Sequence, residues 1–348
     1  SERFFDPNFR GLPWKEMVTE KRKALSENPT DELVKSALGD LLKSLRVSHT
    51  GFYTSSDQTY WALQSIFSHS VEAYPLCQVG AWFESKNGSW FVRNIFESSP
   101  AFEAGLKVGD EVLAVDGHSF SPILSFQAEE SNCAKARSID IRKGPDLPSV
   151  AVKVTPRFES IQSAMLRATL ASARFYEVGG LQIAYFHLWT GTHETFKTAL
   201  HEYLQRLHAN VDGLILDLRD GFGGAGPEFI EPLFASEGRP AVFNKPVVAL
   251  INEGVRSGKE WVSYILKKQK RAVLLGNTTA GAFIAGSPFE IEKDKYLLYL
   301  AVSDFGPPDV TEPIEGVGVS PDIFVPYERS YSNGADPQLE RALEVVAQ

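Results

Sequence analysis

Ser257 is the residue of this chain best placed to do chemistry. It lies in the run 252–260 (NEGVRSGKE), a few residues after the apolar run Val247–Ile251. A short, continuous apolar run is typical of a strand buried on both faces of a parallel sheet. A serine between such a strand and a helix is in the position where a hydroxyl can serve as a nucleophile.

A helix is expected over residues 257–269. Trp261, Tyr264 and Ile265 would form its apolar face, and lysines gather near its expected end (Lys267, Lys268 and Lys270). Backbone N–H groups at the start of such a helix can stabilise negative charge on a nearby oxygen. Serine is also a common N-cap, so the local sequence leaves both interpretations of Ser257 open.

A glycine-rich loop is expected to face this serine. The run 217–224 (DLRDGFGG) follows the predicted buried strand 214–218, and the carboxyl ends of such strands usually carry the ligand site. A backbone N–H of Gly223 or Gly224, together with that of Gly258, could form an oxyanion hole.

The same loop also fits a dinucleotide-binding pattern, with glycines at 221, 223 and 226 after a strand. Pro227 follows at once, and Glu253, the first acidic residue beyond the next predicted strand, comes late for a ribose partner. A nucleotide-binding enzyme therefore stays a weaker alternative.

The chain divides into three segments with different sequence patterns. Residues 1–75 are predicted to be helical, with Thr30 as the cap of a helix that ends before Ser48 and His49. Residues 76–155 show short alternating strands and turns, and residues 156–348 alternate strands with helices, which favours an α/β layered domain. In this last segment strands are predicted at 181–186, 214–218, 272–275 and 296–300, and helices at 196–207 and from about 227.

The middle segment contains the string 98–117 (SSPAFEAGLKVGDEVLAVDG), which resembles a PDZ domain. PDZ domains bind C-terminal peptides as an added strand. The resemblance implies that a terminal carboxylate is held by backbone N–H groups of a loop at Gln78, Val79, Gly80 and Ala81. The alternative is a domain that serves only as packing or as a lid.

Four strings in order resemble the C-terminal processing (tail-specific) proteases and their tricorn-like relatives, a family of serine peptidases. They are the PDZ-like string, DLR-x-x-x-GG from Asp217, N-x-x-x-x-S-x-x-E from Asn252, and the run 318–323 (GVSPDI). The resemblance implies an α/β fold with a crotonase-like protease core, an N-terminal helical region and an inserted PDZ-like domain. It also implies that Ser257 attacks a peptide carbonyl. No Cys/His spacing resembles a zinc site, so we expect no metal, and we expect no cofactor.

One position departs from the family pattern. Processing proteases usually activate the serine with a lysine in G-x-x-T-x-G-K, and the matching run 276–282 (GNTTAGA) ends in Ala282. Lys259 is a poor substitute, because two residues along a helix turn it about 200° from Ser257. Either the chain is a catalytically inactive peptide-binding homologue, or another base acts.

The tricorn-like branch of the family uses a histidine that follows a serine, with a glutamate to orient it. By this resemblance Ser48, His49 and Glu315 match those residues. An imidazole titrates near neutral pH, and a carboxylate can fix its tautomer. His49 could instead be a helix-end histidine bonded to carbonyls, and His187 is a competing base.

Composition limits the partners. The 348 residues carry 35 Lys plus Arg and 44 Asp plus Glu, a net charge of −9, and 43% are hydrophobic. No basic run suits nucleic acid, and no apolar run approaches the roughly 20 residues of a membrane span. We expect protein or peptide substrates recognised by C-terminal or unstructured segments. The first residues lack signal-peptide features, so the protein is either cytoplasmic or has lost a leader. Because its single-unit layout with a PDZ-like segment resembles the processing proteases, we favour an extracytoplasmic location after leader removal, with a cytoplasmic one as the alternative.

Overall fold

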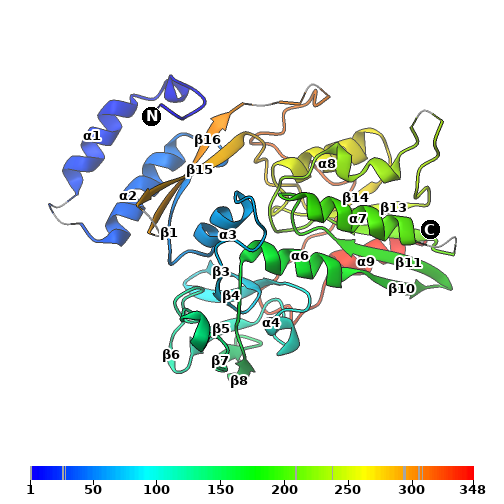
Figure 1. The fold of residues 1–348 in the computed structure, drawn as a ribbon, viewed down its shortest axis with the longest axis horizontal. Coiled ribbons are helices and arrows are strands. Elements are labelled where there is room, and N and C mark those ends of the chain that lie inside the picture. Colours follow the sequence, from blue (N-terminus) through cyan, green and yellow to red (C-terminus); the bar gives the residue numbers. More distant parts are fainter. Residues whose placement is uncertain are drawn as a thin grey trace.

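The computed structural model describes residues 2–25, 27, 29–207, 210–236, 238–292, 295–304, 306–307 and 309–348. The chain has a mixed α/β fold with three regions. In Figure 1 the N-terminal helices lie beside a small sheet on the left, a second sheet extends downward, and the largest sheet with its helices lies on the right.

The largest sheet has the strand order β10-β11-β12-β13-β14-β17. β10 runs antiparallel to β11, and all the other neighbouring strands of this sheet run parallel, as expected for the predicted α/β layered domain. The strands are β10 (Arg174–Val178), β11 (Leu181–His187), β12 (Gly213–Asp217), β13 (Val247–Ile251), β14 (Val273–Gly276) and β17 (Ile323–Phe324). The buried runs of β12 and β13 agree with the apolar runs of the sequence to within one residue.

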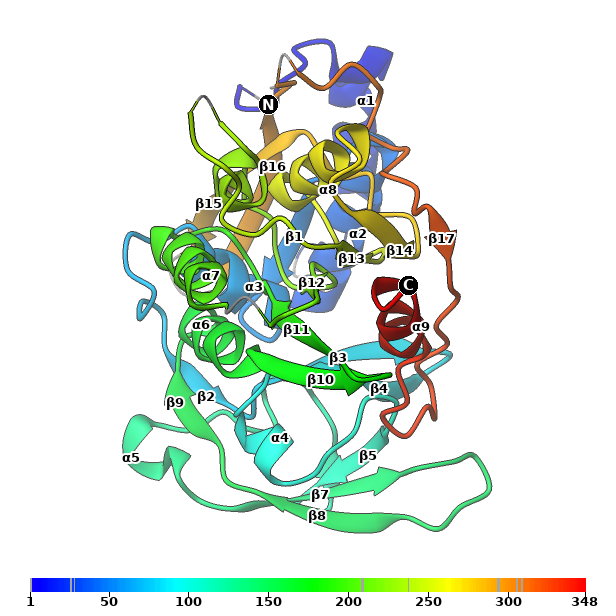
Figure 2. The ribbon, with the colours of Figure 1, turned by 90° about the vertical axis from the view of Figure 1, so that its right-hand side faces the viewer.

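Helices cover both faces of this sheet (Figure 2). Alternate residues of β12 and β13 point to opposite sides, so Leu216 and Ala249 pack with one group of helices and Ile215 and Val248 with another. The first group comprises α6 (Ile161–Ser172), α7 (Glu194–Arg206) and α8 (Gly258–Lys268), and the second is α9 (Pro337–Val346). This two-sided burial fixes the carboxyl edge of the sheet, where the site lies.

The N-terminal region contains α1 (Trp14–Ala24), α2 (Asp31–Ser44) and α3 (Gln58–Ile66). Thr30 caps α2 as predicted, because its hydroxyl accepts a hydrogen bond from the N–H of Leu33 at 3.3 Å. The region is not wholly helical: β1 (Gly51–Thr54) pairs with β16 (Tyr296–Ser303), which pairs with β15 (Ala285–Glu292). The predicted strand 296–300 therefore exists but belongs to this separate sheet.

The second sheet, of the middle segment, is antiparallel with the order β3-β4-β5-β7-β8, and β6 pairs with β5. Its strands are β3 (Ala81–Lys86), β4 (Ser89–Ile95), β5 (Glu111–Val115), β6 (His118–Ser119), β7 (Arg137–Arg142) and β8 (Val150–Val154), with short helices α4 (Pro100–Glu103) and α5 (Glu130–Cys133). At its base β2 (Leu76–Gln78) pairs with β9 (Arg157–Glu159), so the chain enters and leaves this segment at one place. A disulfide joins Cys77 in β2 to Cys133 in α5.

Two further features differ from the sequence prediction. The helix expected from Pro227 is replaced by two short 3₁₀ turns, at Pro227–Phe229 and Glu231–Leu233, because prolines at 227 and 232 interrupt helical hydrogen bonding. The C-terminal α9 was not predicted. Before α9, the segment 325–336 runs past the second sheet, where the Tyr331 hydroxyl donates to Glu111.

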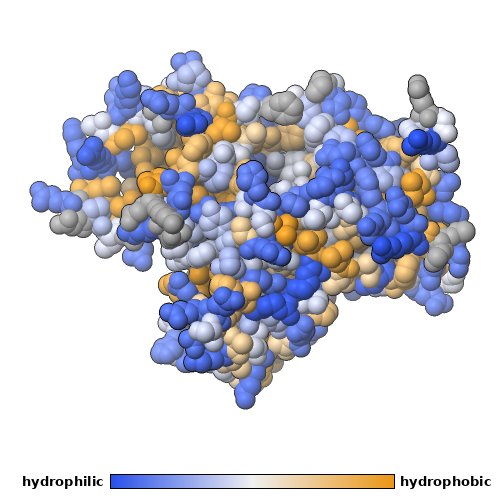
Figure 3. All heavy atoms as spheres, viewed as in Figure 1, coloured by the Kyte–Doolittle hydropathy of each residue, from blue (hydrophilic) through white to orange (hydrophobic). Residues whose placement is uncertain are grey.

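On the face shown in Figure 3, hydrophilic residues predominate over the downward-pointing second sheet and over the helices on the right. Hydrophobic residues gather at the upper left, over the N-terminal region. Among the described residues, no helix combines the length and apolar character needed to cross a membrane.

Candidate active site

Ser257 lies in the turn between β13 and the first residue of α8. Its backbone adopts φ 53° and ψ −130°, a conformation that residues with a Cβ rarely take and that costs on the order of 1–3 kcal/mol. The strained residue is held by its N–H, which donates to the Ala282 carbonyl at 2.7 Å and to Glu260 Oε2 at 3.2 Å. The side chain lines a cavity instead of continuing the helix surface.

The carboxylate of Glu260 holds this turn in place through hydrogen bonds. Glu260 is fully buried, and besides Ser257 it accepts hydrogen bonds from the Thr279 hydroxyl (2.6 Å) and from the N–H groups of Gly281 and Ala282 (2.7 Å each). Burial raises its pKa, and the four hydrogen bonds oppose that rise. The loop 279–282 is therefore fixed to the nucleophile turn through one side chain.

Lys259 points away from the cavity. Its ammonium is fully buried and donates to the carbonyls of Leu188 and Trp189 (3.2 Å each) and Asp220 (2.5 Å). Burial lowers its pKa to about 7, although nearby carboxylates raise it. Lys259 thus ties α8 to the segments that follow β11 and β12, and all three of its donors are used there.

The predicted oxyanion residues lie beside Ser257. A Cβ built on Gly223 would fall 2.5 Å from the Ser257 Cβ and 3.1 Å from the Gly258 nitrogen, so only glycine allows this approach. Gly224 has φ +87° and packs against Thr192. Among the described residues, no acceptor is found for the backbone N–H of Gly258, Gly223 or Gly224. Backbone N–H groups that lack an acceptor, at the start of a helix and in a glycine loop, can stabilise a negative charge that develops during a reaction.

His49, Ser48 and Glu315 form a connected chain of hydrogen bonds. The Ser48 hydroxyl lies 2.9 Å from His49 Nδ1 and donates to Glu315 Oε2 at 2.8 Å, while the Ser48 N–H donates to Glu315 Oε1 at 2.8 Å. Glu315 Oε2 also accepts from the N–H groups of Phe283 (2.7 Å) and Ile284 (3.0 Å). These three residues come from opposite ends of the sequence and meet beside the loop that Glu260 holds.

The surroundings of His49 keep its imidazole neutral. Burial is the main reason that its pKa falls to about 4; the charge of Arg256 lowers it further, and Glu315 opposes both. Burial alone would raise the pKa of Glu315, but its hydrogen bonds from Ser48, Phe283 and Ile284 bring the pKa below the ordinary value. The carboxylate is therefore charged and the imidazole is available as a base.

Ser257 and His49 line one cavity of about 560 Å³. Ala282 lines it as well, at the position where the processing proteases carry lysine. The Tyr299 ring lies 5.5 Å from the His49 ring, and a Cβ on Gly286 would come within 2.7 Å of the His49 Cβ. The sheet of β1, β16 and β15 therefore supplies the wall against which the imidazole is placed.

The other residues considered from sequence lie elsewhere. His187 is buried outside this cavity, with Nε2 3.0 Å from the Arg219 carbonyl and Nδ1 3.5 Å from Glu97. The loop through Gly221, Gly223 and Gly226 leads into the two 3₁₀ turns and not into an α-helix, so it has no helix N-terminus for a pyrophosphate and does not favour a nucleotide site.

The four residues predicted to hold a peptide carboxylate are buried. Gln78 ends β2, Ala81 begins β3, and the N–H of Gly80 already donates to Gln78 Oε1 at 3.2 Å. The Val79 carbonyl accepts from Ala101 at 2.8 Å. Peptide binding at this loop stays a prediction. Among the described residues, no cluster of His, Cys, Asp or Glu suited to a metal ion is found.

The sequence did not reveal how Lys259 and Glu260 act, and it did not single out Arg256 or Tyr299. Lysine and glutamate at successive helix positions look like an exposed pair, and only the packing of two buried loops around them shows otherwise. Glu260 did carry a signal, since Glu at the third helix position after Ser257 fits a capping box.

Comparison with known proteins gives consistent matches. The sequence pattern of peptidase family S41 matches residues 231–325. The chain is 26% identical over 258 residues to carboxyl-terminal-processing peptidase 2 of Arabidopsis thaliana chloroplasts, covering 65% of this chain and 48% of that one. It is 26% identical over 314 residues to a tricorn-like protease C-terminal subunit of Sulfurisphaera tokodaii, covering 80% and 35% respectively.

Among solved structures, the photosystem II D1 C-terminal processing protease superposes with a TM-score of 0.57 at 19% identity, covering 100% of this chain and 94% of that one, a likeness of fold. The chain spans about half the length of the curated relatives it matches.

Proposed function

We propose that the chain is a serine endopeptidase of the peptidase S41 type, whose pattern matches residues 231–325, and that it cleaves unstructured or C-terminal segments of proteins or peptides. Ser257 is the nucleophile and His49 the general base. The observation that carries the proposal is that both side chains line one cavity, with His49 joined to Glu315 through the Ser48 hydroxyl. Ala282 in place of lysine leaves His49 as the candidate base in the cavity that Ser257 lines.

The hydrogen bonds determine which ring nitrogen of His49 acts. The Ser48 hydroxyl has one proton, and that proton is donated to Glu315. Ser48 can then only accept from His49, so Nδ1 carries the imidazole proton and Nε2 keeps a free lone pair. Nε2 is the nitrogen that takes the proton of Ser257 as its oxygen attacks the substrate carbonyl.

The remaining steps follow from acyl transfer. The oxyanion of the tetrahedral intermediate accepts hydrogen bonds from Gly258 N–H and from Gly223 or Gly224 N–H. His49 returns the proton to the leaving amine, which leaves an acyl-enzyme on Ser257, and water deprotonated by His49 then releases the product.

The three segments take separate roles in this proposal. Residues 1–75 carry Ser48 and His49, residues 76–155 form an inserted PDZ-like domain, and residues 156–348 form a crotonase-like core. Pairing of β2 with β9 supports an insertion, because both ends of the middle segment meet there. The inserted domain presents or gates the substrate: Trp82, Arg93 and Phe96 line a cavity that shares residues with the one holding Ser257.

Labelling with a fluorophosphonate probe tests the assignment. Covalent labelling at Ser257, lost in Ser257→Ala and in His49→Ala, is expected, together with loss of peptide hydrolysis. Ser263→Ala, which removes a buried hydroxyl elsewhere in α8, is the control and keeps its labelling. A folded protein that no probe labels would refute the enzyme and support the inactive peptide-binding homologue. Hydrolysis that survives Ser257→Ala would refute the nucleophile.

A further inference from the structure

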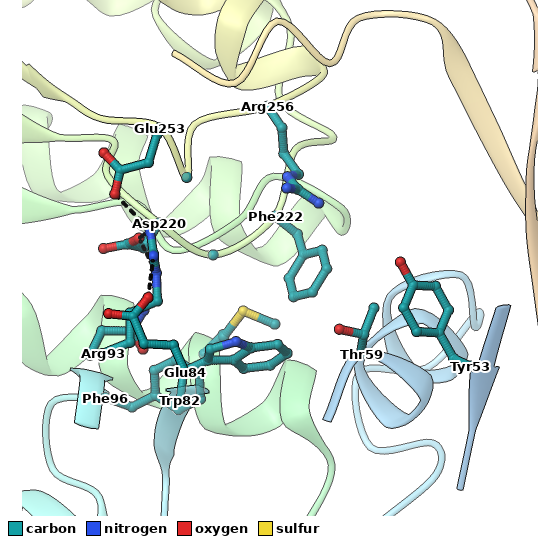
Figure 4. A pocket seen from close by; sticks show the side chains of 14 residues that line it. Tyr53, Thr59, Trp82, Glu84, Arg93, Phe96, Asp220, Phe222, Glu253 and Arg256 are labelled. Carbon is teal, nitrogen blue, oxygen red and sulfur yellow. Dashed lines mark hydrogen bonds and ion pairs between the residues drawn. The ribbon is translucent and has the colours of Figure 1, made fainter. Parts of the chain in front are cut away.

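Arg256 directly precedes the nucleophile and has no partner for its charge. It is half-buried and lines both the cavity with Ser257 and the neighbouring cavity shown in Figure 4. There its guanidinium extends from the turn toward Phe222 and away from Glu253 and Asp220. Among the described residues, its guanidinium forms neither a hydrogen bond nor an ion pair.

The other arginines near this cavity are neutralised. Arg93 contacts Glu84 (2.8 Å), Asp220 (3.0 Å) and Glu253 (2.9 Å), and Arg329 contacts Asp220 and Glu253. The charges of Arg93 and Arg329 oppose the effect of burial and help to hold the pKa values of Asp220 and Glu253 below their ordinary values. The carboxylates in reach thus already have arginine partners, whereas the guanidinium of Arg256, which lines both cavities, has none.

The charge of Arg256 acts on the cavity that holds the nucleophile. Burial lowers the pKa of His49, and the charge of Arg256 lowers it further; burial raises the pKa values of Tyr53 and Tyr299, and Arg256 opposes that rise. All three residues line that cavity. Among the described residues lining that cavity, Arg256 is the only one with a permanent charge. An unpaired guanidinium in a concave, partly desolvated site gains most from a carboxylate, which it can bind through two parallel hydrogen bonds.

We propose that Arg256 selects substrates that place a carboxylate next to the bond to be cut. This inference rests on the proposed peptidase function and adds the class of substrate. This carboxylate can belong either to an acidic side chain or to the free C-terminus of a peptide. Arg256 is then a specificity residue that contacts the substrate and takes no part in proton transfer.

Binding to the full chain carrying Ser257→Ala tests this without turnover. The probes are fluorescein-labelled decapeptides of Ala, Leu and Ser in which one Glu occupies each position in turn, each paired with its Gln counterpart. The neutral parent is used with a free and with an amidated C-terminus. We expect one Glu position, or the free terminus, to bind about tenfold more tightly than its neutral partner, as charge-assisted hydrogen bonds provide.

Variants then assign the preference. Adding Arg256→Gln is expected to bring the ratio of affinities to about one, and Arg256→Lys to keep part of it, because lysine preserves the charge but not the planar fork. Arg206→Gln, on the exposed surface of α7, removes the same charge elsewhere and keeps the full ratio. A Glu position preferred over Gln locates an acidic side chain, whereas a preference confined to the free terminus locates the chain end.

The inference is overturned if no Glu position and no free terminus improves affinity, if no peptide binds at millimolar concentration, or if the preference survives Arg256→Gln. Its failure is distinguishable from failure of the peptidase proposal. If the fluorophosphonate probe does not label the unmodified protein, the peptidase proposal fails. The inference about Arg256 still stands in that case if the binding measurement shows the carboxylate preference.

Discussion

Ser257 and His49 face the same cavity but are held there by different means. On the side of the proposed nucleophile, two fully buried residues, Lys259 and Glu260, fix α8 through six hydrogen bonds to three loops and a seventh from the Ser257 N–H. On the base side, His49 depends on one hydroxyl, which depends on one carboxylate. The proposed nucleophile is positioned by several independent hydrogen bonds, whereas the hydrogen bonds that orient the proposed base form a single path that one substitution can break.

The largest effect is expected on the base side. His49→Ala removes the general base and should lower kcat by about 10⁴-fold, whereas its effect on the free energy of unfolding should stay near 1 kcal/mol. Peptide hydrolysis and urea denaturation measure the two quantities. His118→Ala, an exposed histidine of the second sheet, is the matched control. If His49→Ala kept its activity, another residue would have to be the base, and the contrast between Ser257 and His49 would disappear.

On the nucleophile side the expected cost is to stability. Glu260→Ala leaves two N–H groups and the Thr279 hydroxyl buried without their acceptor and should lower the free energy of unfolding by roughly 3 kcal/mol. Denaturation by urea measures this loss. Glu202→Ala, in an exposed pair on α7, should cost less than about 1 kcal/mol. Equal losses in both variants would mean that Glu260 does not anchor the turn.

A smaller effect is expected from the path to His49. Glu315→Gln replaces an acceptor of four hydrogen bonds by an amide and should lower kcat by about 10–100-fold, since the imidazole loses its fixed tautomer. Ser48→Ala should act in a similar way. Because both residues work through His49, the double variant should be little worse than the more impaired single one. Additive losses in kcat would show that the two residues do not form one path.

The smallest expected effect is a shift in pH dependence. Burial and the charge of Arg256 lower the pKa of His49 to about 4, so the imidazole stays neutral, and able to act as a base, until the pH falls to about that value. The profile of kcat/KM should therefore decline on the acid side near pH 4. Removing the positive charge favours the imidazolium, so Arg256→Gln should move this decline to higher pH. An acid limb near the ordinary pKa of about 6.5 in the unmodified protein would contradict the buried position of His49.

Periodicity and apolar runs predicted much of the scaffold. β13 has the predicted bounds, α8 lies within one residue of its predicted ends, and Thr30 caps α2. These features depend on residues close together in sequence. The three-stranded sheet was not predicted, because pairing of β1 with β16 joins segments that no local pattern relates. The 3₁₀ turns after Pro227 show that two prolines can outweigh an apolar pattern.

The residues of the site also fall into those that the local sequence predicted and those that it did not. The strand-turn-helix context predicted Ser257 and the glycine loop, whereas the family resemblance alone suggested His49, Ser48 and Glu315. Arg256, Lys259 and Glu260 could not be assigned from sequence, since a charged residue reads as exposed until its surroundings are known. For Lys259 those surroundings are carbonyls of two distant segments, and for Arg256 they are carboxylates that already pair with Arg93 and Arg329.

The Ser48–Glu315 contact joins residues separated by 267 positions. During synthesis the imidazole emerges well before both its counter-carboxylate and the alcohol that it is proposed to activate. If the proposed mechanism holds, a nascent or partly unfolded chain lacks a working proteolytic centre, which protects the chain and its neighbours from digestion until the two segments meet in the native fold.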